Sequence, residues 1–216
     1  MNIRKKTHQL IMTALFMAII IIMILVPNVG YINLVVIKAT LVHVPVIIGS
    51  IVLGPKIGAI LGLTFGITSL ITNTINPSLL SFAFSPFYQL GDIGGNGWSV
   101  FIAILPRVLV GIIPYYVYQG IMHVFRKKKK RTMCVALPVA AVAGSLVNTL
   151  LVMNLIYICF REEFASAKNI AVDLVYDTIL VIIASNGIPE AIVAAVATTA
   201  IGLILIRITN RNQFVR

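Results

Sequence analysis

The sequence predicts an all-α integral membrane protein: a single membrane domain over residues 1–216, with six transmembrane helices and both termini in the cytoplasm. Composition carries this prediction, because 59% of the residues are hydrophobic, 11% are charged and the mean hydropathy is +1.03. Soluble domains carry roughly 25% charged residues, so an ordinary soluble globule is excluded. Disorder is excluded by the high hydrophobicity, and a disulfide framework by the presence of only two cysteines.

Apolar runs of the length that crosses a bilayer, about 20 residues, recur along the chain between turns and charges. We expect the spans at residues 10–26, 34–53, 57–75, 99–123, 133–159 and 187–206. The first run resembles a signal peptide in its basic start, but it is too long, and a turn follows it in place of a small-residue cleavage site. The second run is the least regular, because it contains Lys38, His43 and Pro45.

Long outer loops are expected after the third and fifth spans. Residues 76–98 are rich in Asn, Pro, Ser and Gly and carry several aromatic residues, which indicates an interfacial aromatic belt or a lid over a ligand. Residues 173–187 are a second lid candidate, because their apolar run is too short to span and is expected to re-enter the membrane. The last helix would then open near Pro189, at a position where proline is tolerated.

The distribution of charge predicts the orientation. With the N-terminus inside, most of the 17 basic residues fall on cytoplasmic segments, and all six acidic residues fall outside or near an outer helix end. Lys and Arg concentrate on cytoplasmic loops in this way. The basic run 126–131 occupies one short loop, so we interpret it as a topology signal or a contact with anionic lipid heads, and we expect no nucleic-acid partner.

Arg107 is the sharpest candidate site residue. It lies about eight residues below the outer end of the fourth span, roughly 12 Å deep, where an ionisable group is costly and usually marks a site. Its planar guanidinium is suited to gripping a substrate carboxylate. The competing interpretation is a structural ion pair with Glu190, near the outer end of the sixth span.

Asn148 and Asn154 lie in the outer half of the fifth span. Each side chain either bonds a ligand or links helices, a role worth about 0.6 kcal/mol on average. His43 is interpreted first as a residue that forms hydrogen bonds within the packing. The sequence shows no nucleophile–base pair, Walker lysine or metal-ligand cluster, so we expect a non-catalytic protein without cofactor or metal.

Two small-residue repeats permit close approach between helices. They are Gly54, Gly58, Gly62 and Gly66 on the third span, and Ala14 and Ala18 on the first. For both, spacing alone leaves open whether the residues pack within the chain or face the helices of a partner.

Taken together, these features resemble the substrate-binding S components of energy-coupling-factor (ECF) transporters, over nearly the whole chain. The first helix carries Ala14-Leu15-Phe16-Met17-Ala18, where that family has an Ala-xxx-Ala docking motif. Five further segments resemble its pantothenate-type members: 37–49 (IKATLVHVPVIIG), 53–59 (LGPKIGA), 84–88 (FSPFY), 106–111 (PRVLVG) and 186–191 (NGIPEA).

The resemblance implies a vitamin-binding subunit of the bacterial cell membrane that has no ATPase of its own. A transmembrane T component and two ATPase subunits would supply the work, and the S component would topple in the bilayer to carry its site inward. Ala14 and Ala18 would then face the T component. Related members take folate, pyrimidine, pyridoxine-type or other vitamins, so these substrates remain alternatives.

Pantothenate fits the candidate residues chemically. Arg107 suits its carboxylate, Asn96, Asn148 and Asn154 suit its amide and hydroxyls, and Tyr88 and Trp98 suit its gem-dimethyl group. Glu190 would repel an anion unless a cation such as Arg107 or Lys38 neutralises it. Two rival classes are a secondary carrier, which usually shows internal repeats and mid-membrane acids, and a lipid-modifying membrane enzyme.

Overall fold

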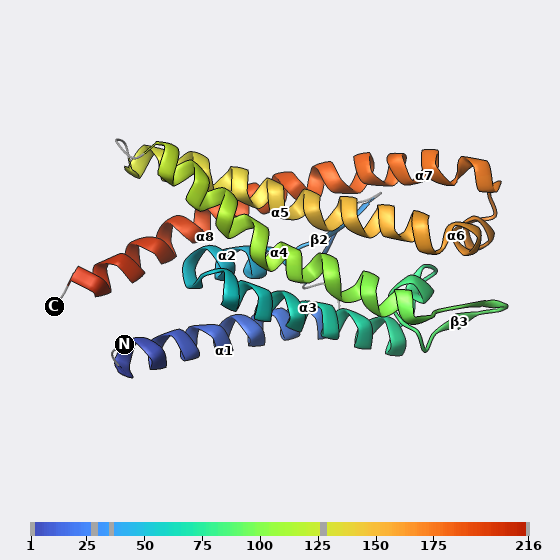
Figure 1. The fold of residues 1–216 in the computed structure, drawn as a ribbon, viewed down its shortest axis with the longest axis horizontal. Coiled ribbons are helices and arrows are strands. Elements are labelled where there is room, and N and C mark those ends of the chain that lie inside the picture. Colours follow the sequence, from blue (N-terminus) through green and yellow to red (C-terminus); the bar gives the residue numbers. More distant parts are fainter. Residues whose placement is uncertain (1–2, 27–29, 35–36, 126–128, 215–216) are drawn as a thin grey trace.

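The computed structural model describes residues 3–26, 30–34, 37–125 and 129–214 as an elongated bundle of helices (Figure 1). The predicted turn after the first span and the basic run 126–131 fall partly outside these residues. The elements are α1 (Ile3–Leu25), β1 (Tyr31–Leu34), β2 (Ile37–Thr40), α2 (His43–Leu53), α3 (Pro55–Ile75), β3 (Gln89–Leu90), β4 (Ile93–Gly94), α4 (Gly97–Val124), α5 (Lys129–Cys159), α6 (Arg161–Lys168), α7 (Val175–Ile182) and α8 (Ile188–Phe214).

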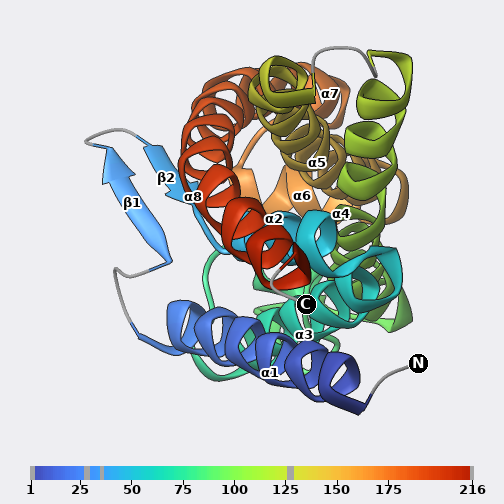
Figure 2. The same cartoon turned by 90° about the vertical axis from the view of Figure 1, so that its left-hand side faces the viewer.

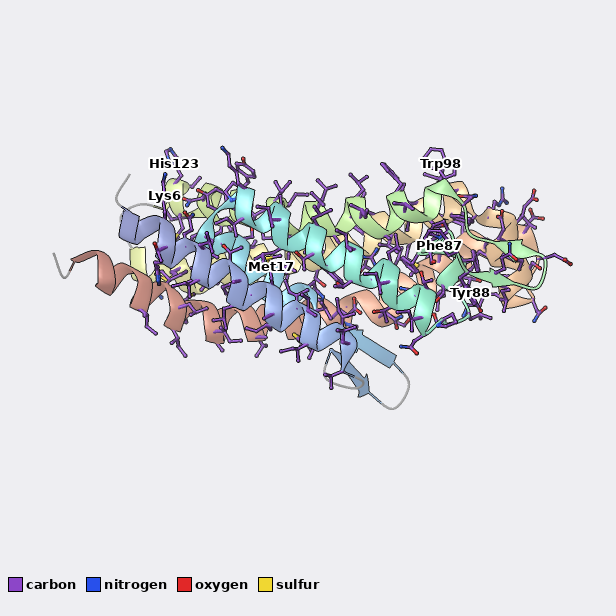
Figure 3. All side chains as sticks on the ribbon, turned by 90° about the horizontal axis from the view of Figure 1, so that it is seen from below. Lys6, Met17, Phe87, Tyr88, Trp98 and His123 are labelled. Atoms are coloured by element: carbon purple, nitrogen blue, oxygen red, sulfur yellow. The ribbon has the colours of Figure 1, made fainter. Side chains whose placement is uncertain are left out.

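The start of α1 and the end of α8 lie at the same end of the bundle, here called the terminal end (Figure 1). The connection between α3 and α4 and the one between α5 and α7 lie at the opposite end, the loop end (Figure 1). Lys6 and His123 mark the terminal end, whereas Phe87, Tyr88 and Trp98 gather at the loop end (Figure 3). The predicted orientation would place the terminal end in the cytoplasm, and this orientation stays a prediction.

Five helical segments in the described part of the chain are long and apolar enough to cross a membrane. They are Lys6–Leu25, Pro55–Ile75, Gly97–Val124, Arg131–Cys159 and Val172–Ile206. The first, third, fourth and fifth predicted spans coincide with four of them. The all-helical membrane architecture is therefore confirmed, but the second and sixth predicted spans differ from the structure.

The second predicted span, 34–53, is not one helix. Its first part forms the antiparallel pair β1–β2, with Tyr31 opposite Thr40 and Leu34 opposite Ile37. Helix α2 has 11 residues, about 16 Å at 1.5 Å per residue, which is too short for a hydrocarbon core of about 30 Å. A helix that begins at His43 keeps Pro45 in its first turn, where a missing N–H is tolerated.

The sixth span begins earlier than predicted. Residues 173–187, expected as a re-entrant lid, form a short 3₁₀ turn, α7 and a π-helical segment, Ile183–Gly187, that continues into α8. Pro189 follows this segment and has no N–H for the regular helical ladder, and the wider π turn accommodates that gap. The prediction that this segment re-enters the membrane without spanning it is therefore wrong, and its role as a lid stays a prediction.

Helix α2 is the centre of the bundle. All of its residues from His43 to Ile51 are buried, and it packs against α1, α3, α4, α5 and α8. Figure 2 shows it between α3 on one side and α8 on the other. Its apolar residues join the larger of two hydrophobic clusters, while a second cluster around Phe82, Phe160 and Phe164 lies towards the loop end.

The glycine repeat of α3 packs within the chain, against α4. A Cβ atom on Gly58 would collide with the Gly111 carbonyl oxygen, and one on Gly62 with the Arg107 carbonyl oxygen. Gly66 lies similarly against Ala103. Gly54 has a different role: it has φ +99° at the turn between α2 and α3, with open space around it. The three remaining glycines form what we call the glycine seam.

Candidate functional site

Arg107 is buried in the bundle, as its depth in the sequence predicts. Its side chain lies on α4 with 7% of its surface exposed. The guanidinium carbon lies 5.0 Å from the centre of the Phe84 ring and 5.4 Å from that of Phe65. Aromatic faces attract a desolvated guanidinium by about 2 kcal/mol. The charge is therefore held between α3, α4 and the 76–96 loop.

The direction of this side chain follows from the residue before it. Pro106 has no N–H, so it cannot make the helical bond to the Ile102 carbonyl oxygen, four residues earlier. Arg107 Nη1 donates to that oxygen instead, at 2.9 Å. The arginine therefore extends back along α4 towards the loop end. The adjacent Pro106 and Arg107 were a sequence signal for this arrangement.

Hydrogen bonds hold the 76–96 loop, which carries Phe84, against the helices. The Ser81 hydroxyl donates to Asn73 Oδ1 at 2.7 Å, which joins the loop to α3. The Ser99 hydroxyl donates to the Phe82 carbonyl oxygen at 2.6 Å, which joins it to α4. Both bonds precede Phe84 in the chain, and the Ser85 hydroxyl that follows it is hydrogen-bonded to the Thr74 hydroxyl at 2.6 Å. Phe84 is thus held over Arg107 by bonds on both of its sides.

Asn96 and Trp98, two predicted site residues, lie away from Arg107. Asn96 is the N-cap of α4: its side chain accepts from the Trp98 backbone N–H at 2.9 Å, and Ser99 completes a capping box. Trp98 is 55% exposed, and its side chain points outward from the bundle in Figure 3. The structure therefore does not bring these two residues together with Arg107.

Tyr88 and Asn154 occupy intermediate positions. Tyr88 is half-buried and packs against the loop-end cluster of apolar residues. The Asn154 amide donates to the Leu150 carbonyl oxygen of its own helix at 2.7 Å, which occupies one of its donors. Their roles in ligand binding stay predictions.

Three polar residues, Ser145, Thr149 and Glu190, meet inside the bundle where α5 packs against α8. The Thr149 hydroxyl is shared between the Ser145 carbonyl oxygen at 3.3 Å and Glu190 Oε2 at 3.4 Å. Glu190 is only 8% exposed. Asn148 Oδ1 and Ser145 Oγ are buried without a hydrogen-bond partner among the described residues. Thr149 and Glu190 thus come together, while the predicted roles of Asn148 and Glu190 and the Arg107–Glu190 ion pair stay predictions.

His43, at the start of α2, adds a further polar group. It is 1% exposed, and neither ring nitrogen has a hydrogen-bond partner in the described part of the chain. The interpretation of His43 as a hydrogen-bonding packing residue is therefore wrong for the described residues. A buried polar group without a partner usually costs about 1–3 kcal/mol.

Gly144 sets a common level for these helices, because Pro114 of α4 and Ile47 of α2 both lie against it. From that level towards the loop end, His43 is four residues along α2 and Asn148 is four residues along α5, about 6 Å in each case. Arg107 is seven residues along α4, about 10 Å, and its side chain extends further. The buried polar groups therefore form two levels, His43 with Asn148 and then Arg107.

Sequence reasoning missed Ser145, Thr149, Phe65 and Phe84 as neighbours of the candidate site. Ser and Thr in helices commonly bond their own backbone, so nothing in the sequence singles these two out. Their significance lies in burial and in contacts across helices, which only the fold shows.

The face of α1 that carries Ala14 and Ala18 is exposed. Phe16, Ile20 and Ile24 turn into the bundle, whereas both alanines lie on the outer surface. They are surrounded there by exposed apolar residues: Leu10, Ile11, Leu15, Ile19, Ile22 and Leu25. We call this surface the alanine face.

Comparisons with known proteins agree with this architecture. A family model described as "ECF transporter, substrate-specific component" matches residues 8–202. The pantothenic acid transporter PanT of Lactococcus lactis subsp. cremoris is 38% identical over 177 residues, 82% of this chain and 82% of that protein. The pantothenate transporter PanT of Leuconostoc mesenteroides is 29% identical over 211 residues, 95% of this chain and 96% of its own length.

Proteins of this family are components of transporters rather than enzymes. The apolar helices and the transporter relatives together make this a multi-pass protein of the cell membrane. The chain belongs to the family of substrate-specific components of ECF transporters.

Proposed function

We propose that this chain binds pantothenate and is the vitamin-binding subunit of an ATP-driven ECF transporter. The observation that supports this substrate is the similarity to two relatives, since both proteins compared above are named as transporters of pantothenate (pantothenic acid). Pantothenate has a carboxylate at one end, hydroxyls at the other and an amide between them, so it requires a cation at one end of its site.

Arg107 binds the carboxylate in this proposal. Its guanidinium is buried, so its interaction with an anion is weakly screened, and its planar fork matches a carboxylate with two parallel hydrogen bonds. Asn148 binds the amide or a hydroxyl. Glu190 accepts from a hydroxyl, and its negative charge disfavours the reverse orientation, in which the carboxylate would lie beside it.

The loop-end residues have secondary roles. Tyr88 and Trp98 would cover the gem-dimethyl group, and Asn154 and Asn96 would supply further hydrogen bonds. For Asn96 and Trp98 this requires movement, because Asn96 caps α4 and Trp98 points outward. The 76–96 loop would act as a lid over the vitamin, and its hydrogen bonds to α3 and α4 would hold it in the closed position.

Transport requires partners with ATPase activity. The T component docks on the alanine face in this proposal, because small residues let a second helix approach closely in lipid. Two ATPase subunits supply the free energy, and the S component topples to present its site to the cytoplasm.

The experiment is a calorimetric titration of the purified chain with pantothenate in detergent. Wild type binds tightly, and Arg107→Ala weakens binding at least about 100-fold, because it removes a charge-assisted hydrogen bond of about 1.5–3 kcal/mol and leaves a carboxylate buried without a partner. Arg161→Ala is the matched control: Arg161 pairs with Asp173 at 3.7 Å near the loop end, and binding should stay within about twofold. If the wild-type chain binds a different vitamin and not pantothenate, the proposal that pantothenate is the substrate is overturned.

A further inference from the structure

Among the described residues, His43 is the largest polar side chain with less than 2% of its surface exposed, and the proposed roles leave it unused. Both ring nitrogens lack a partner among the described residues, although only 1% of the residue's surface is exposed to solvent. Such a group persists where water, an ion or a ligand completes it, since the fold gains nothing from a bare imidazole.

The position of His43 indicates which of these completes it. It lies about 6 Å from the Gly144 level towards the loop end, as Asn148 Oδ1 does on the facing helix. The guanidinium of Arg107 reaches towards the Ile102 carbonyl oxygen, roughly 5–10 Å further along the bundle. A small extended molecule whose carboxylate meets Arg107 therefore ends at the level of His43.

Helix α2 adds to this environment. It begins at His43 within the bundle, and no side chain caps its N-terminus. The N-terminal end of a helix carries a partial positive charge, which favours an oxygen atom beside it. A neutral imidazole supplies one donor and one acceptor, and a hydroxyl can form a hydrogen bond with either of them, because it is itself both a donor and an acceptor.

We propose that His43 recognises the hydroxyl end of the vitamin, opposite the carboxylate held by Arg107. This inference rests on the proposed function and deepens it, because it makes His43 a residue that distinguishes pantothenate from anions without a hydroxyl at that distance. The hydroxyl donates to one ring nitrogen or accepts from the other, and Asn148 contacts the same end of the molecule.

The test is a cycle of protein and ligand changes, measured by calorimetry in detergent. The ligands are pantothenate and its two deoxy analogues, each without one hydroxyl. His43→Phe keeps a buried ring and weakens pantothenate binding about 10- to 100-fold, as expected for a buried polar group left unpaired. Removing the partner hydroxyl weakens binding to wild type by a similar factor, but changes binding to the Phe variant by less than about threefold.

Controls separate recognition from packing. His43→Gln retains a donor and an acceptor and recovers part of the affinity. Thr198→Val removes another fully buried hydroxyl, on α8, that has no hydrogen-bond partner among the described residues, and leaves the affinity unchanged. Thermal melting checks that each variant is folded, and His43→Leu replaces the Phe variant if the larger ring disturbs the bundle.

Two results would overturn the role of His43 alone: pantothenate binding to the Phe variant within about twofold of wild type, or a deoxy penalty of equal size in wild type and variant for both analogues. Failure of the wild-type chain to bind pantothenate is a different result. It overturns the proposed function, and the inference with it.

Discussion

The glycine seam of α3 and the alanine face of α1 have the same sequence signature, but the first is packed against a helix of the chain and the second is exposed. Both consist of small residues four positions apart. The seam is closed against the backbone of α4, whereas Ala14 and Ala18 remain on the outer surface. The difference indicates that a small-residue repeat specifies a close helix contact without specifying the partner helix. The partner of the glycine seam is α4 of the same chain, whereas the proposed partner of the alanine face is a helix of another subunit.

The seam also determines the position of the candidate site. Gly62 lies against the backbone of Arg107 itself, so close packing there sets the depth and the rotation of the arginine. The alanine face has no such link to the polar groups of the bundle. Variants of the glycine seam should therefore change stability and vitamin binding, whereas variants of the alanine face should change only transport by the complete transporter.

The largest effect is expected for Gly62→Leu. The new side chain meets the Arg107 carbonyl oxygen, backbone that cannot move aside, and overpacking of this kind costs about 3 kcal/mol. The melting temperature should fall by roughly 6–12 °C, and pantothenate binding should weaken more than about tenfold as Arg107 shifts. Thermal melting and calorimetry in detergent measure the two quantities.

Gly120→Ala is the matched control for the seam. It lies on α4 with open space around it, and alanine is the better helix former, so the melting temperature should hold or rise slightly. A Gly62→Leu chain that melts and binds as wild type does would show that α3 and α4 are not in close contact here.

The Ala14→Trp/Ala18→Trp double variant should separate binding from transport. Both residues are exposed, so the melting temperature should stay close to that of wild type. The Kd for pantothenate should change by less than about twofold. ATP-driven uptake into vesicles that contain the whole transporter should fall at least about tenfold, because two indole rings prevent close helix approach. Ala200→Trp, at an exposed position on α8, should transport normally. Normal uptake by the double variant would place the docking surface elsewhere.

The smallest effect is expected for Gly66→Ala. Its Cβ would lie 3.0 Å from the Ala103 carbonyl oxygen, a contact that a shift of a few tenths of an ångström relieves. We expect a loss of about 1 kcal/mol and a fall of roughly 2–4 °C in melting temperature, with affinity unchanged. A larger loss than for Gly62→Leu would show that α3 and α4 are in closer contact at Gly66 than at Gly62.

Much of this architecture was predictable from local signals. Long apolar runs gave the positions of four spans, and the depth of Arg107 in one of them predicted its burial. The β1–β2 pair and the short α2 were not recognised, because their apolar character matches that of a span. Pro45 was the available signal, since its ring favours a helix that begins just before it.

The site was less predictable than the fold, for a physical reason. Periodicity assigns a residue to one face of a helix, but it does not say which helix that face meets. Asn96 illustrates the consequence: its amide suits a ligand, yet it caps α4. The significance of His43 and Ser145 lies in buried polar atoms that have no hydrogen-bond partner in the part of the chain that the structure describes, and a sequence does not display this.

The central claim is that pantothenate lies along the bundle between Arg107 and the level of His43 and Asn148. An experimental structure of the chain with pantothenate bound tests it most directly. The account predicts the carboxylate within hydrogen-bonding distance of the Arg107 guanidinium and a hydroxyl within that distance of a His43 ring nitrogen. A vitamin bound with its carboxylate away from Arg107, or outside the bundle, would contradict it.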